Sequence, residues 1–225
     1  MPLFYNLYMR DFLLYVACPK GECKAELFGS NRLYDVAIND YTENNIYPEE
    51  AEYKFSINEY KYRHIKKDLA DIVFNYKVCA FFDDDVEVST EDLNKLFTLG
   101  YSSNFNIWQA SLTKDSYSSW GHLYVKDNSD VREINQIELM MPFFSKSALE
   151  ICWDTFDISY GGWGIEIVWI SRLKNEKIMA VDSIPVKHMR PICSSGRVMP
   201  NGLLIWQECE NTLNYYGVKL PKIVY

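Results

Sequence analysis

Three consecutive aspartates, Asp83, Asp84 and Asp85, are the residues of this chain whose types and spacing most directly suggest chemistry. The run from Tyr76 to Phe82 before them is rich in β-forming residues and predicts a buried strand. On an extended chain, side chains two residues apart project from the same side, so Asp83 and Asp85 can converge on one ion. Such oxygen ligands suit Mg²⁺ or Mn²⁺. Taken alone, however, the three residues favour a solvated acidic loop.

Two later residues add to this picture. Glu166 lies directly behind a Gly161-Gly162-Trp163-Gly164 loop, where an indole and mobile backbone can hold a ring while a carboxylate takes a proton from its hydroxyl. A carboxylate favoured by a helix N-terminus is the alternative interpretation of Glu166. His188 lies in a predicted loop and can be a third ligand of Mn²⁺, although a surface histidine is the simpler interpretation.

The bulk composition limits the class of protein and its partners. The 225 residues are enough for one domain, predicted to span 1–225, and 48% hydrophobic and 24% charged residues are typical of a soluble globular protein. A formal net charge of -8 argues against a nucleic-acid partner, because binding phosphates non-specifically needs a basic surface. An anionic substrate would therefore need a metal ion or a local basic pocket.

The expected compartment is the cytoplasm. The apolar run from Phe12 to Cys18 is too short to cross a membrane, and no signal-peptide pattern is visible. The six cysteines form no C-x-x-C pair, which favours reduced, mostly buried thiols over a zinc or redox site.

Alternating strand and helix patterns predict an α/β domain with one mixed sheet and helices on its faces. Strands are expected at Phe12–Ala17, Leu33–Ile38, Tyr76–Phe82, Ile107–Leu112, Ile134–Phe144 and Ile178–Asp182. Helices are expected from Ser56 or Asn58 to Tyr76, from Ser89 or Thr90 to Gly100, after Ser145, from Ile165, and from Leu203 to Tyr216. The first of these helices carries Lys67 on a charged face, which either faces solvent or turns one cation toward a phosphate.

In this order, the motifs resemble those of the glycosyltransferase-A superfamily, the metal-dependent transferases that use nucleotide sugars. The matching residues are Ala17 to Lys20 after an early strand, Asp40, Asp83 to Asp85 as the D-x-D motif, Glu166 at a helix start, and His188 near the end. A closer resemblance is to a plant and bacterial family of uncharacterised transferase-like proteins. Its features here are Trp108-Gln109-Ala110-Ser111-Leu112, Ile137-Glu138-Leu139-Met140-Met141-Pro142-Phe143-Phe144-Ser145, Gly162-Trp163-Gly164-Ile165-Glu166, Val181-Asp182 and His188.

The resemblance implies roles for individual residues. Asp85 and His188 would bind Mn²⁺ or Mg²⁺, with Asp83 on the metal or the ribose, and Glu166 would be the catalytic base. The nucleotide-sugar pocket would include Ala17, Lys20, Asp40 and Asp84, with Lys67 and Arg190 steadying the diphosphate. Acceptor binding would involve Trp108, Trp120, Glu138 and Trp163.

The resulting prediction is an inverting glycosyltransferase that uses a nucleoside-diphosphate sugar, with UDP expected, and a glycan or glycoconjugate acceptor such as a bacterial surface polysaccharide. Two departures from the pattern are the lack of an obvious acceptor domain and Glu166, where the closer family often has an aspartate. A binding module that has lost turnover is one alternative. A phosphohydrolase of the aspartyl-phosphate type is the other, disfavoured because the acidic cluster lies well inside the chain and no later Asp pair follows.

Overall fold

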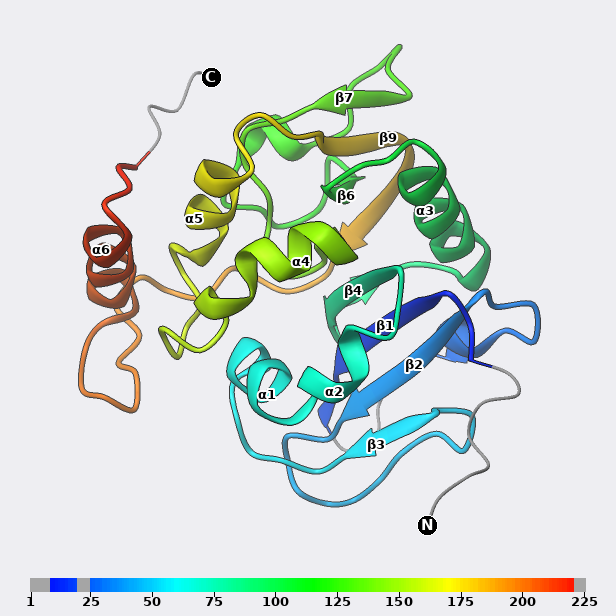
Figure 1. The fold of residues 1–225 in the computed structure, drawn as a ribbon, viewed down its shortest axis with the longest axis horizontal. Coiled ribbons are helices and arrows are strands. Elements are labelled where there is room, and N and C mark those ends of the chain that lie inside the picture. Colours follow the sequence, from blue (N-terminus) through cyan, green and yellow to red (C-terminus); the bar gives the residue numbers. More distant parts are fainter. Residues whose placement is uncertain (1–8, 20–24, 221–225) are drawn as a thin grey trace.

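The computed structural model describes residues 9–19 and 25–220. Within these ranges, strands form one mixed sheet in the order β3-β2-β1-β4-β8-β6-β9-β5, with β7 pairing with β9 (Figure 1). The strands are β1 (Phe12–Ala17), β2 (Tyr34–Asn39), β3 (Tyr53–Phe55), β4 (Val78–Asp83), β5 (Val86–Glu87), β6 (Ile107–Leu112), β7 (Val131–Glu133), β8 (Phe143–Ser145) and β9 (Ile178–His188). Strands β3, β2, β1 and β4 are parallel to one another, and β8 is antiparallel to both β4 and β6.

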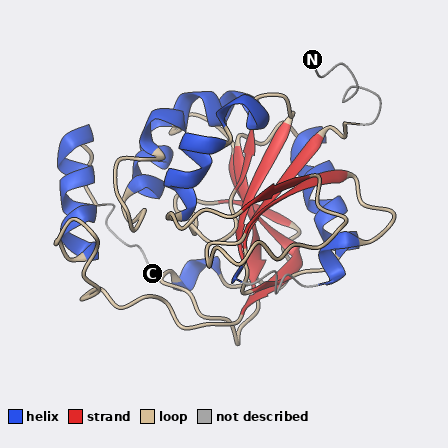
Figure 2. Cartoon of the chain, turned by 90° about the horizontal axis from the view of Figure 1, so that it is seen from below, coloured by secondary structure: helices blue, strands red, loops and turns tan. Residues whose placement is uncertain are grey.

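Helices cover both faces of the sheet (Figure 2). They are α1 (Lys61–Asp68), α2 (Ala70–Val73), α3 (Thr90–Ser102), α4 (Lys146–Cys152), α5 (Ile165–Arg172) and α6 (Ile205–Tyr216), with short 3-10 turns η2 (Ala25–Phe28), η3 (Gly121–Leu123) and η4 (Trp153–Thr155). Helix α3 packs against β6 and β9, whereas α6 packs beside α5 at the edge of the molecule. The predicted α/β class, with a mixed sheet flanked by helices, is confirmed.

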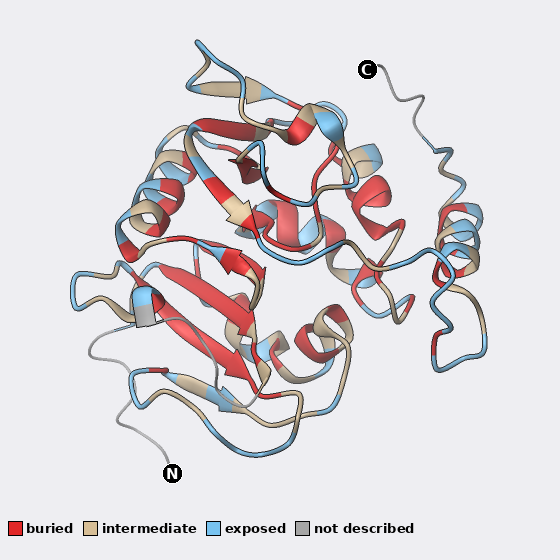
Figure 3. Cartoon of the chain, turned by 180° about the vertical axis from the view of Figure 1, so that it is seen from behind, coloured by how far each residue is buried: buried red, intermediate tan, exposed pale blue. Residues whose placement is uncertain are grey.

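Two adjacent phenylalanines of β4 show how the core is divided into two layers. Successive side chains of a strand point to opposite faces. The ring of Phe81 contacts those of Tyr62 and Phe156 on one face, while Phe82 contacts Phe143 on the other. Both phenylalanines are buried, as is most of the central sheet (Figure 3). Burying such a ring stabilises the fold by about 1.5–3 kcal/mol, so the aromatic residues of this chain serve mainly as core.

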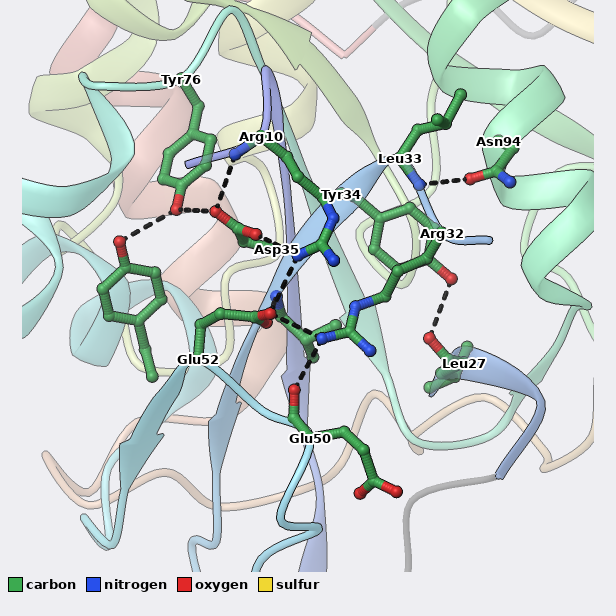
Figure 4. A network of polar contacts seen from close by, with 12 residues as sticks. Arg10, Leu27, Arg32, Leu33, Tyr34, Asp35, Glu50, Glu52, Tyr76 and Asn94 are labelled. Carbon is green, nitrogen blue, oxygen red and sulfur yellow. Dashed lines mark hydrogen bonds and ion pairs between the residues drawn. The ribbon is translucent and has the colours of Figure 1, made fainter. Parts of the chain in front are cut away.

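The amino ends of the parallel strands are joined by a polar network (Figure 4). Arg10 Nη1 lies 2.6 Å from Asp35 Oδ1 and 3.0 Å from Glu52 Oε1. Tyr76 donates its hydroxyl proton to Asp35 at 2.9 Å, and Arg32 lies 2.6 Å from Glu52. These carboxylates are each paired with a cation, so this edge holds the strands in register.

Three predicted elements differ from the structure. The expected helix to Tyr76 divides into α1 and α2 at Leu69, a buried residue with φ -115 and ψ 7, and no Pro or Gly marks this break. The predicted strand 134–144 was wrong for most of its length. The carbonyl groups of Met140 and Pro142 accept hydrogen bonds from β4, but proline has no N–H to continue a ladder, and only Phe143–Ser145 forms a strand.

Strand β9 extends beyond its expected end, and this correction affects the site. It runs through Pro185 to His188, with an irregularity in its pairing to β6 that accommodates the proline. The expectation of reduced cysteines was wrong for Cys18, which is disulfide-bonded. Cys79, Cys152, Cys193 and Cys209 are free thiols.

Candidate functional site

The carboxyl ends of β1, β2 and β4 meet at one level of the sheet. Ala17 pairs with Asn39 on one side and with Asp83 on the other. Beyond this level lies a cavity of about 550 Å³, here called the aspartate cavity, whose charged wall residues include Lys61, Asp83, Asp84, Asp85, His188 and Arg190. Open α/β sheets bind their ligands at this edge, so the aspartates lie where the parallel strands present a ligand site.

Asp85 and His188 meet because β5 pairs with β9. Val86 lies opposite His188 in this antiparallel pair, and the N–H of Met189 donates to the carbonyl of Asp85 at 2.9 Å. His188 Nε2 therefore lies 3.2 Å from Asp85 Oδ2, although the two residues are 103 positions apart. The other ring nitrogen, Nδ1, lies 2.8 Å from the carbonyl oxygen of Tyr117, which fixes the orientation of the imidazole.

Two cations accompany the three aspartates. Arg190 Nε donates to Asp85 at 2.8 Å, and its Nη2 pairs with Asp84. Lys61 Nζ lies 2.7 Å from Asp83 Oδ1 and donates to the carbonyl of Leu139 at 2.6 Å. The cavity thus combines carboxylates and cations that can exchange partners when an anion enters.

The electrostatics of the Asp85 and His188 pair favour its charged forms, whereas burial raises the pKa of Asp83 and of Asp84. Burial acts to raise the pKa of Asp85, but hydrogen bonds from His188 and Arg190 outweigh it and hold that pKa below its ordinary value. Burial acts to lower the pKa of His188, but the Asp85 carboxylate and the Tyr117 carbonyl raise it above its usual range. Asp85 is therefore an ionised carboxylate, and its partner imidazole holds a proton more readily than a free histidine does.

The donor set fits a divalent cation with open coordination positions. Asp85 Oδ1 is buried and lacks a hydrogen-bond partner, and it lies on the same carboxylate that faces His188 Nε2. Within the described residues, no group of three or more His, Cys, Asp or Glu side chains is arranged to hold a metal ion. The protein would then supply two ligands, and oxygens of substrate and water would complete the shell, as Mg²⁺ and Mn²⁺ permit.

A second cavity of about 460 Å³ adjoins the first and has a different lining. We call it the tryptophan cavity, because its walls carry Trp120, Trp163 and Trp206. It also exposes Glu138 and Glu166, together with apolar side chains such as Ile137 and Ile167. The two cavities share the wall residues Ser119, Glu138, Leu139 and Trp163.

Glu138 and Glu166 are both buried carboxyl groups of raised pKa. Burial raises the pKa of Glu166 to about 8, and the charge of Glu138 adds to this, against the N–H groups of Glu166 itself and Gly164. Burial also raises the pKa of Glu138, although the Ser118 hydroxyl, at 2.7 Å, and the Ser119 N–H, at 3.0 Å, oppose it. A carboxyl group whose pKa is about 8, as that of Glu166 is, is suited to accept or donate a proton near neutral pH.

The loop that carries Trp163 is held by helix α6. The carboxylate of Glu208, which is 3% exposed, accepts hydrogen bonds from the N–H of Gly161 at 2.9 Å and of Tyr160 at 3.2 Å. Gly164 has φ +94, and a side chain there would place its Cβ 3.1 Å from Cys209 Sγ. Helix α6 thus supports the loop closely enough to require glycine.

Comparison with known proteins defines the fold further. No protein-family model matches the chain, and no curated protein matches it by sequence. It is similar to S. aureus TarS 1-349 in complex with UDP-GlcNAc, with a TM-score of 0.57 and 10% identity over 92% of this chain and 65% of that chain. It is also similar to S. aureus TarS, with a TM-score of 0.52 and 11% identity over 81% of this chain and 37% of that chain. The chain has a glycosyltransferase-like fold.

At these identities, the likeness concerns the fold. The chain spans less than two thirds of the length of these TarS chains. A197 from STIV also matches, at 18% identity over 88% of this chain and 93% of its own, but its TM-score of 0.42 does not define a shared fold. Across the described residues, no helix is both long and apolar enough to cross a bilayer.

Within the glycosyltransferase-like fold, most of the residues singled out from the sequence lie around the two cavities. The aspartate cavity is lined by Ala17, Asp83, Asp84, Asp85, Glu138, Trp163, His188 and Arg190. The tryptophan cavity is lined by Trp120, Glu138, Trp163 and Glu166. Lys20 lies outside the described residues. The structure therefore brings together the acidic cluster, the histidine and the glycine-rich loop.

Three predicted site residues lie elsewhere. Trp108 is core rather than a wall residue: it is fully buried, stacks on Phe143 with ring centroids 5.4 Å apart, and donates from Nε1 to the carbonyl of Leu96. Asp40 is buried below the turn that follows β2, where its carboxylate accepts from the N–H of Thr42 at 3.0 Å. Lys67 is exposed and does not line the aspartate cavity, so its placement does not support the predicted role.

Lys61 and Trp206 are the principal residues that the sequence analysis missed. The helix was expected to begin at Ser56 or Asn58, but α1 begins at Lys61, directly beside the carboxyl ends of the strands. Lys67 is six residues farther along, a rise of roughly 9 Å, which carries it away from the site. Trp206 stands at the start of a helix that mixes apolar and polar residues, and the packing of α6 beside α5 brings it to the cavity.

Proposed function

We propose that this chain is a metal-dependent glycosyltransferase that moves a sugar from a nucleoside-diphosphate sugar to a hydroxyl group of a glycan or glycoconjugate. The aspartate cavity carries this proposal, because its carboxylates, imidazole and two cations converge at the carboxyl edge of a parallel sheet. The likeness of the fold to a structure that contains UDP-GlcNAc supports a nucleotide-sugar donor and makes UDP the expected nucleotide.

Asp85 and His188 would hold Mn²⁺ or Mg²⁺, and Asp83 would contact the metal or the ribose. When bound, the cation supplies positive charge that neutralises the departing nucleoside diphosphate. Arg190 and Lys61 already lie among the aspartates, and each can turn from its carboxylate to a diphosphate oxygen. Arginine is well suited to this because its planar guanidinium binds phosphate through two donors.

Glu166 would act as the general base. As the acceptor hydroxyl oxygen attacks the anomeric carbon, a C–O bond forms, the bond from that carbon to the diphosphate oxygen breaks, and the hydroxyl proton moves to Glu166. A single displacement of this kind inverts the configuration of the anomeric carbon. Glu166 lines the tryptophan cavity, which adjoins the aspartate cavity, and its pKa of about 8 means that its ionised form is a stronger base than an exposed glutamate.

The proposal is tested by a panel of nucleotides with and without Mn²⁺ or Mg²⁺, read by thermal unfolding. We expect UDP to raise the melting temperature only when the metal is present, and Asp85→Asn to abolish this shift. The matched control is Asp127→Asn, which removes an exposed surface carboxylate and should keep the shift. A chain that binds none of the common nucleotides in a metal-dependent way is not the proposed transferase.

A module that only binds nucleotide sugars would also show the metal-dependent thermal shift, but it would not release UDP from a UDP-sugar. Release of UDP from UDP-sugars, measured in the presence of acceptor candidates, separates turnover from binding. Release that Asp85→Asn abolishes identifies an enzyme, whereas binding without release identifies a module.

A further inference from the structure

The walls of the tryptophan cavity combine indoles with carboxyl groups and no basic side chain. Trp120 precedes η3, Trp163 lies in the glycine-rich loop, and Trp206 lies on α6, so three separate segments bring indoles to one space. Among the described residues that line it, none is Lys, Arg or His. The aspartate cavity, in contrast, contains Lys61 and Arg190.

An anion would find no partner in this space. Moving a phosphate or carboxylate out of water onto apolar walls is costly unless a cation compensates it. The acidic side chain of Glu210, which is exposed at the cavity wall, would oppose it further. A neutral sugar ring does not carry this cost. Its apolar face can contact the indoles, and its hydroxyl groups can form hydrogen bonds with the carboxyl oxygens.

The outer wall of the cavity comes from one face of α6. Trp206, Cys209 and Glu210 are spaced three and four residues apart and therefore lie on the same side of the helix. The Trp206 side chain is 40% exposed, whereas Trp108 and Trp169 are fully buried in the core. An exposed indole beside a cavity is available to a ligand in a way that the core indoles are not.

We propose that the tryptophan cavity binds the acceptor as an uncharged sugar and excludes acceptors that carry phosphate or carboxylate on the ring that enters. If the aspartate cavity holds the donor, as proposed above, the shared walls Glu138 and Trp163 place the acceptor ring beside the donor sugar. The acceptor hydroxyl would then lie near Glu166. Trp206 is the specificity-determining residue on the outer side.

The test uses matched sugars that differ in one charge. Methyl disaccharides of glucose, galactose, mannose and N-acetylglucosamine are compared with their uronate forms and their glucosamine-type amine forms by ligand-observed NMR and tryptophan fluorescence. The whole chain is used, with UDP and Mn²⁺ present. We expect at least one neutral disaccharide to bind saturably and its uronate form to bind at least tenfold more weakly.

Variants of α6 assign the binding to this cavity. Trp206→Ala should weaken the neutral sugar at least tenfold, and Trp206→Phe should restore part of the loss because a ring remains. The matched control is Tyr215→Ala, which removes a 73% exposed aromatic ring from the same helix outside the cavity and should change nothing. The UDP-dependent thermal shift should be the same in all three variants, which also shows that each is folded.

Each alternative outcome has a definite meaning. Tighter binding of the uronate or amine form than of the neutral sugar overturns the proposed acceptor class. Failure of every neutral sugar to bind, with a normal UDP-dependent shift, overturns the acceptor site while the proposed transferase function stands. Failure of the UDP shift as well contradicts the proposed function itself.

Discussion

The aspartate cavity and the tryptophan cavity share four wall residues, but the carboxyl groups in their walls have different surroundings. In the first, three carboxylates are balanced by Lys61, His188 and Arg190 through direct contacts of 2.7–3.2 Å and a further Asp84 to Arg190 pair. In the second, carboxyl groups lie against indoles with no cation among the described wall residues. Charge is neutralised in one space and suppressed by burial in the other.

If the chain is the proposed transferase, this difference would separate the two tasks that the reaction requires. A departing diphosphate needs fixed positive charge, which the aspartate cavity holds in ion pairs until an anion enters. A proton acceptor needs a raised pKa, which burial beside apolar walls supplies to Glu166. Glu138, which lines both cavities, stands at the boundary between these environments.

The largest expected effect comes from Glu166→Gln, which keeps the shape of the side chain and removes the base. We expect transfer to fall roughly 10²–10⁴-fold, the usual contribution of a positioned base, while the UDP-dependent thermal shift stays the same. Glu150→Gln, which changes an exposed glutamate of α4 that lines neither cavity, is the control and should change the turnover rate little. If the Glu166→Gln variant transfers sugar at the normal rate and the Glu138→Gln variant does not, the base is Glu138 and not Glu166.

A smaller effect is expected from Lys61→Ala in the aspartate cavity. A hydrogen bond to a charged group contributes about 1.5–3 kcal/mol, so the affinity for UDP with Mn²⁺ should fall roughly 10- to 100-fold. Lys67→Ala removes an exposed lysine from the same helix and should leave that affinity unchanged. Calorimetric titration of both variants measures the difference. Equal affinities of the two variants for UDP would mean that Lys61 only neutralises the charge of Asp83 and does not contact the diphosphate.

The last expected effect concerns stability rather than activity or ligand affinity: it is a pH dependence of the unfolding free energy that comes from Glu166. Its pKa is raised from 4.5 to about 8 in the folded protein, so the folded state keeps a proton that the unfolded chain releases. The resulting stabilisation is complete below pH 4.5 and is lost as pH rises through about 8, by at most about 1.4 kcal/mol per pH unit. Urea unfolding of the wild type and Glu166→Gln between pH 5.5 and 7.5 should show the loss only in the wild type. If the unfolding free energies of the two proteins change with pH in the same way, the pKa of Glu166 is not raised in the folded state.

The order of the site residues could be predicted from the sequence because strand ends and helix starts have local signals. The run Phe12–Ala17 and the cap at Ser145 were identified correctly, and of the two caps expected for the next helix, Ser89 or Thr90, the structure has Ser89. The resemblance implied that Asp85 and His188 share a metal ion, but local sequence signals could not predict the strand pairing that brings the two residues together. This pairing depends on a two-residue strand, Val86–Glu87, that is too short to leave a pattern.

Trp108 shows a second limit of what can be predicted from the sequence. Its surroundings were interpreted correctly as a strand, but side-chain alternation alone does not say which face of a sheet carries a ligand. Here α3 packs closely on the Trp108 side chain, because a Cβ at Gly100 would lie 2.1 Å from the indole. The helix therefore covers Trp108, and the indoles that reach a cavity are those on loops and on α6.

Glu208 has a consequence for protein engineering. One helix near the end of the described chain supplies Trp206 and Glu210 to a cavity wall and, through Glu208, anchors the backbone of the glycine-rich loop. Under the proposed function, substitutions at 206 and 210 would change which acceptor is selected and leave the residues of the aspartate cavity in place. A redesign that exchanges the whole helix must carry a glutamate at 208, or the loop beneath it loses its anchor.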